Sequence, residues 1–295
     1  MRVPCAFNGC ASLRPTLGRY PQDGIVPIAH SRDTAGPMAL SMPDLELMDR
    51  VIAGGPRAQP AALKAVRLGR VAATLANLDA DTRAGFDAAL AKMQAAGVTI
   101  VDVDMPRLMD LNGQIGFPVA LYEAHDDLVA YLARYRPGLS IAQLAEAIVS
   151  PDVKGTLQGL VIPRKLPGPN NTLVDAKPAY DAAMATARPA LQALYAETFK
   201  AHRLDALVFP TVPAVAMLAN AESSSIGNFV GVIQNTDPGS NAGVPGLQLP
   251  IALGAASRLP IGLEIDGPMG SDRRLVAIGL AMERLLGRLP GPAAR

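Results

Sequence analysis

Tryptophan is absent from this 295-residue sequence, and cysteine occurs only as Cys5 and Cys10. A bond between two cysteines this close together would close a short loop and constrain the unfolded chain only slightly. The sequence therefore lacks a disulfide framework, and a reduced, cytoplasmic location is expected. Neither cysteine is paired with a base in the sequence, so inert buried thiols are expected and not nucleophiles.

The sequence also has no excess of positive or negative charge. The 27 lysines and arginines nearly balance the 26 acidic residues, which leaves a formal net charge of +1. This balance, with no block of like charge, argues against nucleic acids and membranes as partners. No apolar run approaches the roughly 18 residues of a membrane-spanning helix, and the first residues lack a signal-peptide pattern. A soluble chain is therefore expected.

Common catalytic and nucleotide-binding motifs are missing as well, including the Walker loop, G-x-G-x-x-G, H-E-x-x-H and the G-x-S-x-G elbow. The three histidines, His30, His125 and His202, are scattered, and none has a second ligand at metal spacing. No metal and no cofactor are therefore expected. His30 has Ser31 and Asp33 nearby, but adjacent residues in extended chain point to opposite faces. A solvated or turn-forming cluster is expected there, and not a catalytic one.

Apolar residues make up 49% of the sequence and charged residues only 18%, a balance typical of a buried α/β core. Proline and glycine recur every few residues from 1 to 38, so this stretch is expected to be extended chain and turns. A strand at 63–71, a helix at 81–96 and a strand at 98–103 follow one another closely. Such a strand–helix–strand unit predicts a parallel pair.

Helix signals and apolar runs define the other expected elements. Ser41 begins a helix that ends at Gly54, and Ser271 with Asp272 caps the last helix. Proline marks the expected breaks. The pattern predicts a helix at 107–136 interrupted at Gly113, Gly116 and Pro118, a helix at 140–149, a helix at 177–202 kinked or broken at Pro189, a strand at 204–213 whose Pro210 stays outside any central ladder, and a hairpin of 247–253 with 259–265.

The first forty residues resemble the amidase-signature family. Arg2-Val-Pro4 and the residues up to Gly9 resemble the second half of the pattern G-G-S-[IV]-R-x-P-A-x-x-x-G. The family elements L-[KR]-P-T-x-G-R and D-x-x-G-P-M follow in order at 13–19 and 33–38. Ser12 and Leu40 depart from the family pattern, which usually has Gly and Arg at these positions.

The C-terminal part agrees independently with this resemblance. Residues 205–213 are similar to the family strand D-x-[LI]-[LIV]-x-P-[TA]-x-P, and 259–268 are similar to G-L-P-[VI]-G-[LM]-[QE]. Within the family, residues 235–246 most resemble the arylacetamide group, the mandelamide and indoleacetamide hydrolases. The expected substrate is therefore a small-molecule carboxamide.

The resemblance implies one mixed sheet covered by helices on both faces, in a single incomplete domain over 1–295. The family hydrolyses amides with a Ser-cis-Ser-Lys triad, and in the family order the triad and its glycine-rich turn all precede Met1. The N-terminal part is therefore expected to be missing, with no catalytic residue in this chain and no activity. Two alternatives remain open. The first is that the chain is one subunit of a split amidase whose N-terminal part another chain supplies. The second is that the chain is a noncatalytic small-molecule-binding protein.

Several residues are candidates for the site under this resemblance. Arg2, beside the absent serine, either anchors an acid in the nucleophile turn or forms a structural ion pair. Asn235 and Asp237 either contact the acyl group or cap a turn. Phe7 and Phe229 either contact an aromatic acyl group or belong to the core. The candidate acyl pocket consists of Phe7, Thr211, Asn235 and Asp237.

Overall fold

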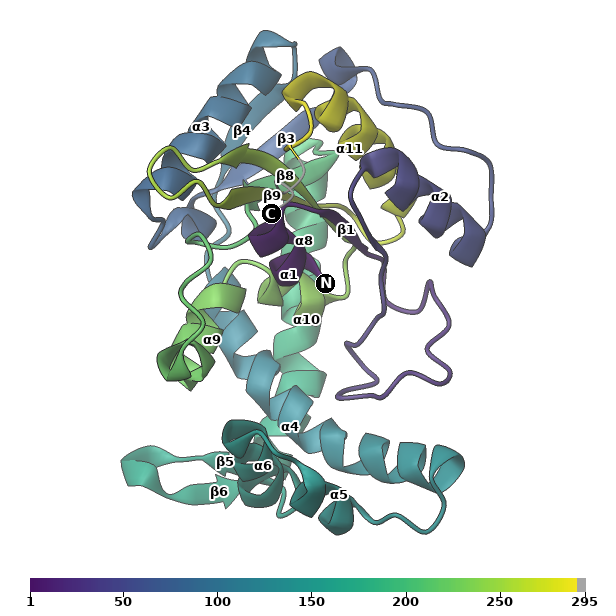
Figure 1. Cartoon of the computed structure of the whole chain (residues 1–295), viewed down its shortest axis with the longest axis vertical. Coiled ribbons are helices and arrows are strands. Elements are labelled where there is room, and N and C mark those ends of the chain that lie inside the picture. Colours follow the sequence, from purple (N-terminus) through teal and green to yellow (C-terminus); the bar gives the residue numbers. More distant parts are fainter. Residues whose placement is uncertain (291–295) are drawn as a thin grey trace.

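A seven-stranded mixed sheet forms the centre of the molecule (Figure 1). The structure, a computed structural model, describes residues 1–290. Strand β3 runs parallel to β4 and to β7, and the other neighbouring strands pair antiparallel. The order across the sheet is β2 (Met38–Ala39), β1 (Ala11–Arg14), β8 (Gly246–Leu253), β9 (Pro260–Asp266), β7 (Ala206–Pro210), β3 (Arg67–Val71) and β4 (Thr99–Val103).

Helices cover both faces of this sheet, as the resemblance implies. The sheet separates two apolar cores, one on each face. Adjacent residues of β7 belong to different cores, since Val208 packs in the first and Leu207 in the second. The first core is completed by α2 (Met42–Ala53), α3 (Ala80–Ala95) and α11 (Asp272–Leu286), and the second by α4 (Leu108–Tyr135) and α8 (Arg188–His202). None of the helices within residues 1–290 is long and apolar enough to span a bilayer.

Several local predictions are confirmed. Helix α3 joins the parallel strands β3 and β4, and β8 with β9 forms the expected hairpin. The Ser41 side chain accepts a hydrogen bond from the Asp44 amide at the start of α2. Residues 177–202 stay helical through Pro189, because α7 (Lys177–Ala182), a five-residue π-helical turn and α8 follow one another directly. The predicted break at Pro189 is therefore wrong, and a kink there stays a prediction.

The prediction of extended chain at the N-terminus is wrong, because Arg2–Asn8 form helix α1. Pro4 lies in the first turn, where its missing N–H leaves no hydrogen bond unmade. Gly9 ends the helix with φ of 70°, a left-handed conformation that glycine adopts readily. Cys5 and Cys10 are joined by a disulfide, which corrects the expectation of free thiols.

Two predictions about proline are also corrected. Helix α4 runs through Pro118 for 28 residues without interruption, and buried Ile115 and Val119 hold it against the second core. Pro210 is the last residue of β7 and lies opposite Leu263 of β9. The ladder tolerates this proline because β3 pairs with β7 only as far as Val208.

The distal end of α4 carries a separate small lobe, formed by residues 136–176 (Figure 1). Its own apolar cluster includes Leu121 of α4 with Leu157 and Leu166 of the lobe. The β5–β6 hairpin of the lobe has strands only three residues long. The lobe contains α5 (Ile141–Ala147), α6 (Pro151–Thr156), β5 (Lys165–Pro167) and β6 (Leu173–Asp175).

Candidate functional site

A large apolar cavity of about 890 Å³ lies between the sheet body and the lobe. Helix α4 forms one wall, with Phe117 and Leu121, and the lobe contributes Ile148 and Leu157. Helices α1 and α9 (Ile226–Ile233) add Phe7 and Phe229. A concave, largely apolar cavity with a few polar groups is the usual form of a small-molecule site.

A smaller and more polar cavity of about 330 Å³ surrounds the start of α1. It is lined by Met1, Arg2 and Val3, and by Thr236 and Ser240 at the edge of α10 (Asp237–Ala242). The two cavities adjoin, because both are lined by Arg32, Asp33, Phe229, Ile233 and Asp237.

Arg2 is buried below this polar cavity. Its guanidinium forms an ion pair with Glu264 and lies 3.6 Å from Asp266 Oδ1. It also donates to the Thr236 carbonyl at 2.7 Å and to Ser240 Oγ at 2.7 Å. Arg2 thereby ties the start of α1 to β9 and to the segment before α10. These contacts are those of a structural ion pair, which is one of the two roles considered for Arg2. The other role, anchoring an acid in the nucleophile turn, stays a prediction.

Asp266, beside this ion pair, is an unusual buried acid. Its side chain is inaccessible to solvent, and neither carboxyl oxygen accepts a hydrogen bond from residues 1–290. Burial, reinforced by the negative charge of Glu264, holds the pKa of Asp266 well above its usual range. Burial likewise lowers the pKa of Arg14 to about 9. The protonated form of the Asp266 carboxyl is therefore favoured over a wider pH range than in an exposed aspartate.

Because the pKa of Asp266 is higher in the folded than in the unfolded chain, the free energy of unfolding decreases as pH rises between these two values. The contribution of Asp266 is complete below the pKa of an unfolded aspartate, near 3.9, and is lost as pH rises through the folded-state value. We expect the stability of the wild type to fall relative to Asp266→Asn as pH rises from about 4 towards the folded-state pKa, by at most about 1.4 kcal/mol per pH unit. Urea unfolding of both proteins across this range measures the difference, and a constant difference would contradict the assignment.

The four candidate pocket residues lie in different places. Phe7 and Asp237 line the large cavity, whereas Thr211 and Asn235 are absent from the linings of both cavities. Thr211 is fully buried beside Gly262. Asn235 Nδ2 donates to the Thr74 carbonyl at 3.0 Å and to the Pro210 carbonyl at 2.8 Å. Contact of these residues with an acyl group stays a prediction.

The contacts of Asn235 predict a loss of stability on truncation. Asn235→Ala leaves the Thr74 and Pro210 carbonyls without this donor in a buried position, which costs about 1–3 kcal/mol. Urea unfolding at constant pH measures the loss. Asn228→Ala is the matched control, because its amide hydrogen bond to the Glu222 carbonyl is exposed and its loss should have little effect.

A polar network that sequence reasoning did not find lies where the two cavities meet. Arg32 Nη2 donates to Asp237 Oδ1 at 2.7 Å. Asp237 Oδ2 accepts from Asn112 Nδ2 at 3.0 Å and from Asn241 Nδ2 at 3.2 Å. The pair Arg32 and Asp237 is separated by 205 residues, so no local signal in the sequence could have brought the two together.

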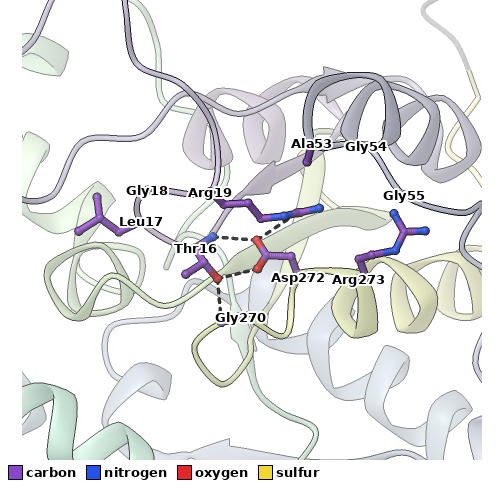
Figure 2. Close-up of a pocket in the computed structure, with 10 residues that line it drawn as sticks. All are labelled: Thr16, Leu17, Gly18, Arg19, Ala53, Gly54, Gly55, Gly270, Asp272 and Arg273. Carbon is purple, nitrogen blue, oxygen red and sulfur yellow. Dashed lines mark hydrogen bonds and ion pairs between the residues drawn. The ribbon is translucent and has the colours of Figure 1, made fainter.

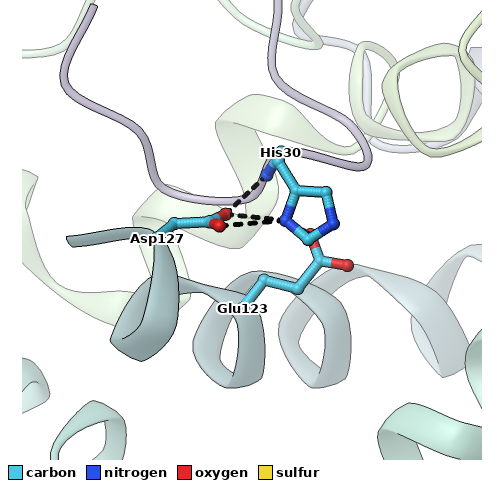
Figure 3. Close-up of side chains that lie close together, drawn as sticks. All are labelled: His30, Glu123 and Asp127. Atoms are coloured by element: carbon cyan, nitrogen blue, oxygen red, sulfur yellow. Dashed lines mark hydrogen bonds and ion pairs between the residues drawn. The ribbon is translucent and has the colours of Figure 1, made fainter. Parts of the chain in front are cut away.

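A second cluster anchors the loop that carries Arg32 (Figure 3). The His30 amide donates to Asp127 Oδ2 at 2.7 Å, and His30 Nδ1 lies 3.0 Å from both Asp127 oxygens. Glu123 accepts from the Ser31 amide at 3.1 Å and from the Tyr180 hydroxyl at 3.0 Å. No second ligand stands at motif spacing from His30 along the sequence, but the fold brings ligand atoms of His30, Glu123 and Asp127 within 4.8 Å of one another. These hydrogen bonds already use the carboxylates to fix the loop to α4.

A further cavity, of about 560 Å³, lies at the start of α11 (Figure 2). The buried Asp272 carboxylate accepts from the Thr16 amide at 2.7 Å and from the Thr16 hydroxyl at 2.6 Å. Arg19 Nη1 lies 3.3 Å from the same carboxylate. The expected cap by Ser271 is wrong, since its side chain makes no capping hydrogen bond. Asp272 instead fills the anion position at this helix start and joins the 16–19 turn to α11.

Comparison with known proteins identifies clear relatives. A family model described as Amidase matches residues 1–276. The chain is 41% identical to a mandelamide hydrolase of Pseudomonas putida over 292 residues, which cover 99% of this chain and 58% of that protein. It is 39% identical to an indoleacetamide hydrolase of Agrobacterium vitis, covering 97% of this chain and 61% of that protein. The chain thus spans about 60% of the length of these relatives.

Solved structures agree with this relationship. The chain superposes on a crystal structure of an amidase with a TM-score of 0.76 at 25% identity, covering 97% of this chain and 61% of the other. It superposes on a native peptide amidase from Stenotrophomonas maltophilia with a TM-score of 0.75 at 25% identity, covering 98% of this chain and 61% of the other.

Proposed function

Because the chain belongs to the amidase family, we propose that it forms the acyl-binding part of an enzyme that hydrolyses an aryl acetamide to the acid and ammonia. The observation that carries this proposal is the pair of adjoining cavities. An aromatic acyl group fits the apolar cavity, and its carboxamide then reaches the polar cavity beside Met1 and Arg2. That is the segment which matches the nucleophile motif of the family.

Amide hydrolysis needs an activated nucleophile, a proton relay for the leaving amine and donors for the oxyanion. In the family motif the nucleophilic serine stands immediately before the residue that Met1 replaces, and the cis-serine and the lysine stand earlier still. We therefore propose that these 295 residues bind the amide without hydrolysing it. Sequence outside them, on the same polypeptide or on a partner chain, supplies the three catalytic groups.

Blocking the apolar cavity tests the proposed acyl site. Ala120 of α4 lines this cavity, so Ala120→Trp places an indole where the acyl group is proposed to bind. We expect the affinity of the 295-residue chain for phenylacetamide, measured by isothermal titration calorimetry, to fall about tenfold or more. A tryptophan side chain competes directly for the same apolar volume.

Ala130→Trp is the matched control, because Ala130 is an exposed residue of the same helix and does not line the cavity. It should leave the affinity unchanged. Equal affinity of the two tryptophan variants would place the acyl group elsewhere. Tight binding that stays without turnover when the missing catalytic groups are supplied would favour a noncatalytic binding protein.

A further inference from the structure

Helix α9 forms one wall of the apolar cavity, but none of its own residues is buried. Ile226, Phe229 and Ile233 follow one another at three- and four-residue spacing, so they share one face of the helix, and all three line the cavity. Ile226 and Phe229 are nevertheless 66% and 49% exposed. The apolar face of a helix normally packs against protein, so this wall of the cavity is incompletely covered.

Other walls of the same cavity expose apolar side chains as well. Ile28, Phe117 of α4 and Val153 of α6 all line the cavity, and each is at least 40% exposed. Apolar walls that face one cavity bury each other's surface when the cavity narrows, which is favourable. The chain itself therefore holds the surface that can cover the exposed face of α9.

The segment 216–233, which carries α9, is tied to the body of the molecule at its two ends. Before it, the Val215 amide donates to Asp79 Oδ2 at 2.9 Å. After it, the buried Asn235 side chain donates to two main-chain carbonyls of the body. Both attachments lie outside the segment, so they can stay in place while it moves.

Between these attachments the segment makes hydrogen bonds mainly to itself. Within the part of the chain that the structure describes, which leaves out the side chains of 221 and 224, its hydrogen bonds join residues that all lie between 216 and 236. The main packing partner of α9 is the neighbouring turn at 221–224, and Figure 1 shows α9 at the side of the molecule, above the lobe. A region with few buried contacts opens at a low cost in free energy.

We propose that residues 216–233 form a lid that closes over the apolar cavity when a ligand enters it. The lid turns about its attachments at Val215 and Asn235, and closure brings Ile226 and Phe229 towards the exposed apolar residues of the other walls. The ligand favours the closed state because it contacts more apolar surface there. The inference rests on the proposed function only in taking the apolar cavity as the ligand site.

Distances between spin labels measure closure directly. Val230→Cys places a label on α9 at a residue that does not line the cavity, and Val149→Cys places one on an exposed residue of the lobe. The two native cysteines are joined to each other, so only the introduced cysteines react with the label. We expect phenylacetamide to shift the distance between the labels, measured by double electron–electron resonance, to shorter values.

A second pair of labels, Val51→Cys with Val149→Cys, is the matched control. Val51 is an exposed residue of α2, which packs on the sheet, so its distance from the lobe should stay constant when the lid closes. An unchanged distance between 149 and 230 with phenylacetamide bound would overturn the inference. An equal change in both pairs would also overturn it, because the lobe and not the lid would then have moved.

Hydrogen exchange of the unlabelled chain tests the lid without a ligand. We expect the amides of α9 to exchange on the order of tenfold faster than those of α10, a helix of similar length that buries most of its residues. Bound phenylacetamide should slow the exchange of α9. Equally slow exchange in both helices of the free chain would contradict a mobile lid. Absence of phenylacetamide binding would instead contradict the proposed function, and the exchange of the free chain still tests the lid.

Discussion

A polypeptide of these 295 residues alone is expected to show no measurable hydrolysis of mandelamide or indoleacetamide. This expectation follows from the proposal that the nucleophile, the relay and the oxyanion turn lie outside these residues, since the match to the family motif begins after its serine. Loss of a nucleophile alone lowers kcat on the order of 10⁶-fold, and the residual activity usually depends on an oxyanion hole. Ammonia release from purified protein measures the result.

The matching gain-of-function experiment joins an upstream segment that contains the glycine-serine turn and the lysine to residue 1. This extended protein is expected to hydrolyse aryl acetamides, and replacing its serine by alanine should abolish the activity again. Turnover by the 295-residue chain that survives removal of contaminating enzymes would refute the assignment of the catalytic groups. An extended enzyme that takes only long-chain aliphatic amides would refute the aryl acetamide specificity.

Arg2→Met is expected to destabilise the fold by about 3–5 kcal/mol. The substitution keeps most of the side-chain volume but leaves Glu264 buried without its cation, and removing one partner of a buried ion pair typically has an effect of this size. Arg2 also donates to Thr236 and Ser240, so the anchorage of α1 is lost at the same time. Urea unfolding at neutral pH measures the change in the free energy of unfolding.

Arg70→Met provides the control for this experiment, because the pair of Arg70 with Asp102 is 36% and 73% exposed. Exposed ion pairs contribute about 0–1 kcal/mol. A similar loss of unfolding free energy in both variants would mean that the buried Arg2 pair stabilises the fold no more than an exposed pair does. Arg2→Lys, which retains the charge with fewer donors, should lie between wild type and Arg2→Met.

Local patterns predicted the local structure well. The 246–266 hairpin and the β3–α3–β4 unit follow from short-range periodicity and turn residues, and both are confirmed. The errors arose where tertiary packing outweighs a local rule. Pro118 stays inside α4 because its neighbours are buried, and Asp272 binds Thr16 across 256 residues while Ser271 leaves the helix start uncapped.

The candidate site was predictable only in part. The motif resemblance proposed Phe7 and Asp237 as pocket residues, and both line the apolar cavity, while their contact with a ligand stays a prediction. It gave no reason to select Arg32, which reaches Asp237 only because His30 and the Ser31 amide fix their loop to α4. Side chains that meet through long-range folding leave no periodic or spacing signal in one sequence.

The small lobe has its own apolar cluster, distinct from the two cores that hold the sheet. It nevertheless supplies one wall of the apolar cavity, through residues such as Ile148 and Leu157. The chain thus separates the two cores that hold the sheet from a lobe that shapes part of the cavity. We expect chimaeras that replace residues 136–176 to alter which ligands the cavity accepts while leaving the sheet unchanged.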